Sequence, residues 1–408
     1  MKTAIYLNTF AKMANYDLDN LSSYGIKQVA IVAADEYEKF NNAYGKYFSE
    51  IYPCNESKNV FEKITIEFAR EVIKQQVHLG NDIRLICLSE DNLLLTAQLR
   101  DEFNIPGLKL NAAIPFRNKL IMKDVLKSKD IRIPKYSRFD LQTTKPLFDY
   151  FQNLQQELGL PFILKPTSYL GGLGVVLIDS LSAFVEFFKE NPVDVEYEAE
   201  EFISGRLFHC DSIRHNNKTI FSACCEYTNP NFDFQIGKSV ISMPLKNNDP
   251  LTKNILSFNE IVLSALDYEQ GISHHEFFMT EEGELVFLEI AARSPGAVVT
   301  PMYRHAFNVG MEDIDFKMTM DIPFELSITE KNYLSGIFPL MSGKIDRLIN
   351  PQLNSTFEMK WVVKEGDTVK ASKSLRDKSA AITAWHEDYQ KLCEDFDLLK
   401  NFQNILMC

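Results

Sequence analysis

Two glutamates and an arginine near residue 280 have the types and spacing to hold a metal ion and a phosphate. The segment from His274 to Gly296 reads HHEFFMTEEGELVFLEIAARSPG. An extended run that turns at Glu282–Gly283 and returns would place Glu276 and Glu289 close together on paired strands. Two carboxylates at one sheet position are costly unless a proton or a hard cation lies between them, and Mg²⁺ is the usual cation beside phosphate. Arg293 adds a planar fork of donors for phosphate or carboxylate. The alternative for the whole segment is a solvated hairpin.

A glycine-rich segment between two apolar strands is the second candidate site. Residues 161–165 form an apolar strand that ends in lysine, residues 166–174 read PTSYLGGLG, and residues 175–178 are apolar again. These glycines join strand to strand, whereas the phosphate loops of Rossmann and P-loop proteins join a strand to a helix. The segment therefore predicts a hairpin that closes over phosphates with its backbone N–H groups. A simple hairpin turn is the alternative.

The composition indicates a globular chain whose partners are small molecules. The 408 residues are 45% hydrophobic, which is enough for the cores of roughly two to four domains. A net charge of −13 without a cluster of Lys and Arg argues against nucleic acid or an anionic membrane as the partner. No apolar run reaches the ~18 residues of a membrane span, and the N-terminal residues lack a signal-peptide pattern, so we expect a cytoplasmic protein. The seven cysteines lack the paired spacing of a zinc or disulfide framework and are expected to be reduced.

Apolar periodicity indicates which elements carry these residues. In the first ~110 residues, short apolar strands alternate with helical stretches, which predicts a parallel βαβ sheet. No glycine-rich turn follows these strands, so this unit looks like a Rossmann scaffold without its cofactor loop. Apolar pairs at helical spacing predict a helix from Arg117 to Lys127. The last ~75 residues predict mixed, strand-rich structure with a closing helix from about Ile382 to Leu399.

The order of these features resembles the ATP-grasp superfamily over roughly residues 1–330. The features are Lys119, Lys165 with the glycine hairpin, Glu200–Glu201–Phe202–Ile203, Glu276, Glu289 and Arg293. Single elements are weak signals, but their order and spacing together are specific. The sequences FHCD at 208–211 and EIAAR at 289–293, with the small C-terminal unit, look like the carboxylate–amine ligase branch that includes L-amino acid ligases.

The resemblance implies an α/β and α+β multidomain fold with ATP clamped between two small sheets. The units that it implies are an N-terminal Rossmann-like pre-ATP-grasp domain (1–115), the ATP-grasp small or lid subdomain (116–200), the ATP-grasp large subdomain with the metal site (201–330) and a C-terminal α+β segment (331–408).

The resemblance also implies which residues bind the nucleotide. Lys119 and Lys165 would contact its phosphates; for Lys165 the alternative is a surface lysine at a strand end. The glycines would let the backbone approach the phosphates, where side chains would be too bulky. These glycines are Gly171, Gly172 and Gly174. The main chain of Glu201, Phe202 and Ile203 would bind adenine.

The resemblance assigns metal binding and phosphoryl transfer to the hairpin that carries Glu276 and Glu289 and to Arg293 after it. Glu276 and Glu289 would hold one or two Mg²⁺ ions that bridge the β- and γ-phosphates. Arg293 would steady the transferring phosphoryl group or the acyl phosphate, with a structural bridge to Glu289 as the alternative.

Three positions depart from the superfamily pattern. Asn118 replaces the Asp of an Asp-Lys motif, Ala291 stands where Asn is frequent, and Leu207 stands where Glu is frequent. These departures leave a second metal ion and the ribose contact open. His209 and Asp211 alternate along a strand and should share one face, either toward the cleft or in ordinary cross-strand contacts.

The activity implied is ATP- and Mg²⁺-dependent joining of a carboxylate to an amine through an acyl phosphate, with release of ADP and phosphate. Mn²⁺ is an acceptable substitute for Mg²⁺, and a homodimer is compatible with the resemblance. An ATP-grasp carboxylase similar to biotin carboxylase and a non-catalytic ATP-binding module are the alternatives.

Overall fold

The N-terminal unit is a four-stranded parallel sheet covered by helices on both faces, as the sequence predicts. The computed structural model describes residues 1–408 except 10–12, 56–62, 88, 170, 191–194 and 297. The sheet order is β3-β2-β1-β4. Its elements are β1 (Lys2–Asn8), α1 (Leu18–Ser22), β2 (Lys27–Ala33), η1 (Ala34–Glu36), α2 (Tyr37–Tyr44), η2 (Gly45–Tyr47), β3 (Glu50–Cys54), α3 (Ile66–His78), β4 (Asp82–Cys87), η3 (Glu90–Asn92) and α4 (Leu93–Glu102).

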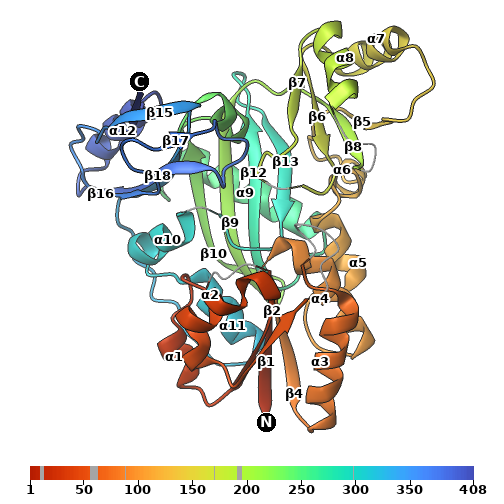
Figure 1. The fold of residues 1–408 in the computed structure, drawn as a ribbon, viewed down its shortest axis with the longest axis vertical. Coiled ribbons are helices and arrows are strands. Elements are labelled where there is room, and N and C mark those ends of the chain that lie inside the picture. Colours follow the sequence, from red (N-terminus) through yellow and green to blue (C-terminus); the bar gives the residue numbers. More distant parts are fainter. Residues whose placement is uncertain (10–12, 56–62, 88, 170, 191–194, 297) are drawn as a thin grey trace.

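Alternate residues of β1 face two different cores. Ala4 and Tyr6 pack with α2, whereas Ile5 and Leu7 pack with α3 and α4. Tyr6 also stacks on Phe316 of α11 (Met311–Thr319), with ring centroids 6.2 Å apart. Through this contact, the N-terminal sheet, at the bottom of Figure 1, packs against the central part of the molecule.

A short helical connection leads from the N-terminal sheet to a separate small unit, at the upper right of Figure 1. Its sheet has the order β5-β8-β6-β7, and its core is rich in phenylalanine. The elements are α5 (Leu110–Ala113), η4 (Ile114–Phe116), α6 (Lys119–Lys127), β5 (Tyr136–Phe139), α7 (Leu147–Leu158), β6 (Phe162–Pro166), β7 (Val176–Ile178), α8 (Leu181–Glu190) and β8 (Tyr197–Glu201). Asn118 caps α6, because its side-chain oxygen accepts from the backbone N–H groups of Leu120 and Ile121. The antiparallel pairing of β6 with β7 confirms the predicted hairpin, of which residue 170 lies outside the described residues.

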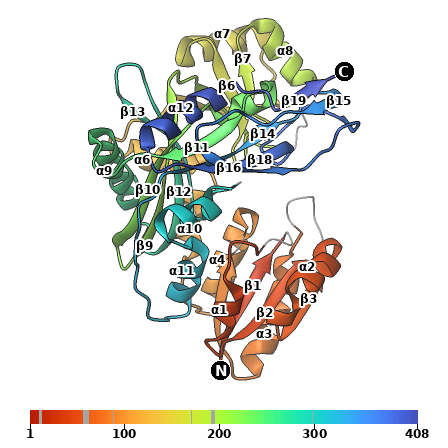
Figure 2. The same cartoon turned by 90° about the vertical axis from the view of Figure 1, so that its left-hand side faces the viewer.

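An eight-stranded antiparallel sheet forms the centre of the molecule. Its order is β13-β12-β9-β10-β11-β14-β18-β16, so strands from 331–408 continue the sheet that residues 201–330 begin. The elements are β9 (Arg206–His215), β10 (Lys218–Tyr227), η5 (Asn231–Ile236), β11 (Val240–Pro244), α9 (Pro250–Ala265), β12 (Gly271–Met279), β13 (Leu285–Ala291), α10 (Val299–Phe307), α11, β14 (Tyr333–Pro339), β16 (Thr356–Trp361) and β18 (Lys378–Trp385). Figure 2 shows α10 and α11 between this sheet and the N-terminal unit.

The chain ends in a small sheet and a helix beside β18. These elements are β15 (Gly343–Leu348), β17 (Thr368–Val369), β19 (Ile405–Met407) and α12 (Tyr389–Leu399). The predicted closing helix is therefore wrong in its first part, since Ile382 lies in β18 and the helix begins only after its cap, Asp388. Ala380, Ile382 and Ala384 alternate toward one core, which a strand satisfies and a helix would not. Among the described residues, no helix combines the length and the apolar character that crossing a membrane requires.

Gly336 makes the junction between β11 and β14 sensitive to a side chain. A Cβ atom on Gly336 would lie 2.3 Å from the Val240 carbonyl oxygen and 2.5 Å from the Cα of Ile241. We expect Gly336→Val to lower the free energy of unfolding by at least about 1–3 kcal/mol, because the strands must separate. Urea unfolding monitored by circular dichroism measures this change. In the control Gly296→Ala, the new Cβ meets nothing within 4 Å and should leave the midpoint unchanged; equal midpoints for both variants would contradict the argument.

Candidate functional site

A single cavity brings the predicted residues together. Its volume is about 1580 Å³, and all of the predicted site residues except Gly174 line it. A pocket for one small ligand typically measures roughly 300–1,000 Å³. The cavity therefore has room for a nucleotide together with further substrates.

The two glutamates of the hairpin stand directly opposite each other, as predicted. Glu276 of β12 is the register partner of Glu289 of β13. Glu276 Oε1 accepts from Asn231 Nδ2 at 2.8 Å and from His274 Nε2 at 3.2 Å. Burial alone would raise the pKa of Glu276, but the hydrogen bond and the charge of His274 lower it, so the group is a carboxylate. Glu289 Oε2 lies 3.3 Å from Lys119 Nζ.

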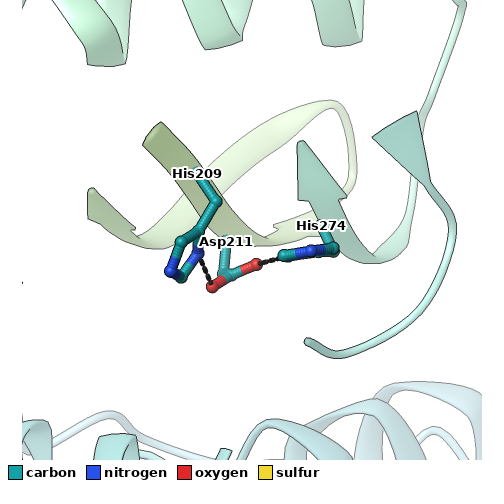
Figure 3. Close-up of side chains that lie close together, drawn as sticks. All are labelled: His209, Asp211 and His274. Carbon is teal, nitrogen blue, oxygen red and sulfur yellow. Dashed lines mark hydrogen bonds and ion pairs between the residues drawn. The ribbon is translucent and has the colours of Figure 1, made fainter. Parts of the chain in front are cut away.

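A chain of buried polar groups leads from Glu276 through His274 to Asp211 and His209, and Figure 3 shows the last three of these side chains. Asp211 accepts from His209 Nδ1 at 2.7 Å, from His274 Nδ1 at 2.5 Å and from the hydroxyl of Tyr303. Burial would lower the pKa of both histidines, but the charge of Asp211 raises each to about 9, so both are protonated at neutral pH. His274 therefore donates to Glu276 with one nitrogen and to Asp211 with the other. His209 and Asp211 share one face, as predicted.

These three groups form an ion cluster and are too close together to surround a metal ion. Their ligand atoms lie within 4.8 Å of one another. However, the hydrogen-bonded pairs are only 2.5–2.7 Å apart, whereas ligands of a tetrahedral Zn²⁺ are separated by roughly 3.3 Å. His275 faces the other side of the sheet, where its Nδ1 lies 3.0 Å from Asn259 Oδ1 and burial lowers its pKa to about 3.

The carboxylate pair fits a hard cation. Glu276 Oε1 already takes both of its donors, and within the described chain Glu276 Oε2 has no hydrogen-bond partner. Carboxylate oxygens facing a cavity are the ligands that Mg²⁺ prefers. Three cationic side chains and a neutral amide line the same cavity: Lys119, Lys165, Arg293 and Asn231.

The two predicted lysines approach the cavity from different elements. Lys119 starts α6, and its Nζ donates to the Tyr169 carbonyl oxygen at 2.8 Å. Lys165, at the end of β6, is only 5% exposed, which contradicts the alternative of a surface lysine. Burial would lower the pKa of Lys165, but Glu200 at 2.8 Å and Glu198 at 3.6 Å raise it, so the ammonium stays charged.

The glycines of the hairpin serve two different purposes. Gly171, Gly172 and Gly174 all have φ between +62° and +74°, a backbone conformation that L side chains rarely adopt. Gly171 and Gly172 line the cavity. A Cβ on Gly174 would lie 2.9 Å from Pro166 Cγ, so this glycine permits close packing at the base of the hairpin.

The connection after β8 presents main chain to the cavity. The Glu201 side chain points away to Arg132 at 3.3 Å and to the Lys135 backbone N–H at 2.9 Å. Phe202 and Ile203 follow and line the cavity with Glu201. Main-chain groups at a strand end can pair with the edge of a planar base, which agrees with the predicted adenine role.

Arg293 forms its ion pair with a residue of the N-terminal unit. Among the described residues it forms no ion pair with Glu289, so the alternative of a structural bridge between these two residues is wrong. Its Nε donates to Glu90 Oε2 at 2.6 Å, and Arg117 donates to the other oxygen of Glu90 at 2.9 Å. Burial would raise the pKa of Glu90, but Arg293 and Arg117 lower it to about 2. The sequence interpretation missed Glu90, although residues just after the carboxyl end of a parallel strand, here β4, are frequent ligand contacts.

Comparisons with known proteins agree with this geometry. The family model described as D-ala D-ala ligase C-terminus matches residues 125–318. An L-arginine-specific L-amino acid ligase of Bacillus subtilis is 26% identical over 321 residues, which are 75% of each chain. The solved structure of an L-amino acid ligase from Bacillus licheniformis matches with a TM-score of 0.74 and 18% identity, over 100% of this chain and 99% of that one. The chain therefore has the fold of solved ATP-grasp ligases, and its sequence is similar to those of carboxylate–amine ligases.

Two further matches are another sequence relative and a solved ATP-grasp structure that contains ADP. An alanine–anticapsin ligase of Bacillus subtilis (strain 168) is 24% identical, over 75% of this chain and 68% of the relative. An N5-carboxyaminoimidazole synthetase from Staphylococcus aureus, solved with ADP, matches with a TM-score of 0.68 and 16% identity, over 98% and 97% of the two chains. ATP-grasp ligases therefore share the fold of this chain, while the role of each site residue and the domain limits stay predictions.

Lys123 is the central cation of a buried ion network that also contains Lys165. It is fully buried on α6, where it donates to Glu198 at 2.7 Å and to Glu200. We expect Lys123→Met to lower the free energy of unfolding by roughly 3–5 kcal/mol, because two buried carboxylates would share only Lys165. Urea unfolding measures the loss.

A second substitution checks that the loss comes from charge. In the double variant Lys123→Met with Glu198→Gln, one lysine, Lys165, again accompanies one glutamate, Glu200. The double variant should therefore be more stable than Lys123→Met alone. A single variant as stable as the unmodified protein, or a double variant with additive losses, would contradict this account of the network.

Proposed function

We propose that the protein is an ATP- and Mg²⁺-dependent ligase that joins a small carboxylate to an amine. A carboxylate oxygen attacks the γ-phosphorus of ATP and the bond to ADP breaks, which gives an acyl phosphate. The amine nitrogen then attacks the acyl carbon, phosphate leaves, and an amide forms with loss of a proton. The observation that carries the proposal is the opposed pair Glu276 and Glu289 in one cavity with Lys119, Lys165 and Arg293.

Each part of the cavity contributes one task in this proposal. Main chain at Glu201–Ile203 holds adenine, and the glycine hairpin offers backbone N–H groups to the phosphates. Lys119 and Lys165 lie at the phosphate chain and offset its charge. Glu276 and Glu289 would hold Mg²⁺, which would supply positive charge to offset that of the phosphates, and Mn²⁺ could serve because it also accepts oxygen ligands.

Arg293 is the residue that acts on the transferring group. Its guanidinium already has one carboxylate partner, Glu90, and one backbone carbonyl partner, that of Ser294, at 2.9 Å. These contacts fix the planar fork before the reactants meet. A preorganised cation costs no reorganisation when charge develops on the phosphoryl oxygens.

The substrates are amino acids or similar small acids in this proposal. The L-arginine-specific L-amino acid ligase and the alanine–anticapsin ligase, by their names, act on such molecules. The cavity beyond Arg293 is lined by polar side chains, Asn15, Ser294 and Glu312, which suits zwitterionic ligands. A cytoplasmic location, a homodimer, and the lack of nucleic acid and membrane partners remain expectations from the sequence.

The direct test uses purified protein with ATP, Mg²⁺ and a pool of amino acids. We expect release of ADP and phosphate together with new masses that equal two substrates minus water. AMP and pyrophosphate as products would overturn the acyl phosphate. Turnover that requires bicarbonate would favour the carboxylase, and ATP binding without turnover for any acid and amine would favour the binding module.

Glu289→Gln should lower turnover by at least about 100-fold, because an amide neutralises one of the two carboxylates that hold the metal. Steady-state release of phosphate measures the change, and circular dichroism checks the fold. Glu281→Gln is the matched control, since Glu281 is exposed at the tip of the same hairpin. Retained activity in Glu289→Gln would remove the metal assignment.

A further inference from the structure

The side-chain amide of an asparagine beside the carboxylate pair is oriented by its hydrogen bond to Glu276. Asn231 is the first residue of η5, the short helix between β10 and β11. Its Nδ2 donates to Glu276 Oε1 at 2.8 Å. A carboxylate can only accept hydrogen bonds, so the amide nitrogen must face Glu276 and the amide oxygen must face elsewhere.

The amide oxygen of Asn231 lacks a partner. Oδ1 is buried and has no hydrogen-bond donor among the described residues. A buried acceptor that has lost water without gaining a donor or a cation destabilises the protein. Asn231 lines the same cavity as Glu276 and Glu289, so a ligand of that cavity is the natural partner for this oxygen.

The strand that carries Glu289 offers no further oxygen ligand on the same face. Residues 289 and 291 share a face of β13, and residue 291 is alanine, directly opposite His274 of β12. Both ring nitrogens of His274 already have partners, Asp211 and Glu276. Asn231 is bonded to Glu276, and its side-chain oxygen has no donor among the described residues, which makes this oxygen a candidate ligand.

We propose that Asn231 Oδ1 is a ligand of the Mg²⁺ ion that Glu276 and Glu289 hold. The inference rests on the proposed function and assigns a residue that neither the family pattern nor the sequence motifs indicate. Mg²⁺ accepts amide oxygens together with carboxylates.

The rival explanation is that Asn231 only steadies Glu276 through its nitrogen. Two substitutions separate these roles. Asn231→Ala removes both the donor and the oxygen, whereas Asn231→Asp removes the donor and keeps an oxygen at the same place. Asn231→Ser is a second truncation that tests the same loss if Asn231→Ala does not fold.

The measurement is the affinity for ADP by isothermal titration calorimetry, with Mg²⁺ and with EDTA. The ratio of the two affinities reports how strongly the metal couples to the nucleotide, without any need for turnover. We expect Asn231→Ala to lower this ratio by at least about 10-fold, the usual loss for a disturbed metal site, while the affinity in EDTA stays unchanged. Asn231→Asp should keep the ratio within about 3-fold of the unmodified protein, a loss of no more than about 0.7 kcal/mol.

The matched control is a substitution at the other end of η5. Ile236→Ala alters the last residue of η5, whose side chain is exposed, and should leave the ratio unchanged. An unchanged ratio in Asn231→Ala, or an equal loss in Asn231→Asp and Asn231→Ala, would overturn the ligand role. Failure of the unmodified protein to bind ADP under either condition would overturn the proposed function itself. This result differs from the two contrary results above, in which the unmodified protein binds ADP.

Discussion

The meeting of two carboxylates at one position of a sheet, Glu276 buried and Glu289 half-buried, is the constraint around which this molecule is organised. Glu276 and Glu289 face each other across β12 and β13, and like charges so placed repel strongly in a cavity of low dielectric. The protein offsets part of this charge with its own groups, protonated His274 beside Glu276 and Lys119 beside Glu289. The remaining negative charge suits a cation, which supports the proposed metal site.

The same principle extends through the three units that meet at the cavity. Lys165 is charged because Glu198 and Glu200 accompany it, and Arg293 is fixed because Glu90 accompanies it from the N-terminal sheet. Each cation meant for an anionic ligand thus has a carboxylate partner before the ligand arrives. This arrangement keeps the charges in place at a free-energy cost that the buried partners reduce.

Local sequence signals predicted the parts of the site that lie within one hairpin. The 13-residue spacing of Glu276 and Glu289 around a turn determines their pairing, and the strand-to-strand context of Gly171, Gly172 and Gly174 determines the hairpin that they form. Glu90 and Asn231 escaped prediction because their meaning depends on contacts with residues 203 and 45 positions away. The end of β18, from Ile382, was predicted as a helix because an apolar run shows its partner strand only after folding.

The element η5 links the metal site to the glycine hairpin. Asn231 at its start donates to Glu276, and Gln235 near its end donates to the Gly172 carbonyl oxygen at 3.0 Å. Because a trans peptide points its C=O and N–H in opposite directions, the Leu173 N–H must point away from Gln235. The backbone donors of the hairpin and the oxygen of Asn231 are therefore oriented from one short segment. A displacement of η5 would disturb its contacts with Glu276 and with Gly172 together, which couples the proposed metal site to the glycine hairpin on the other sheet.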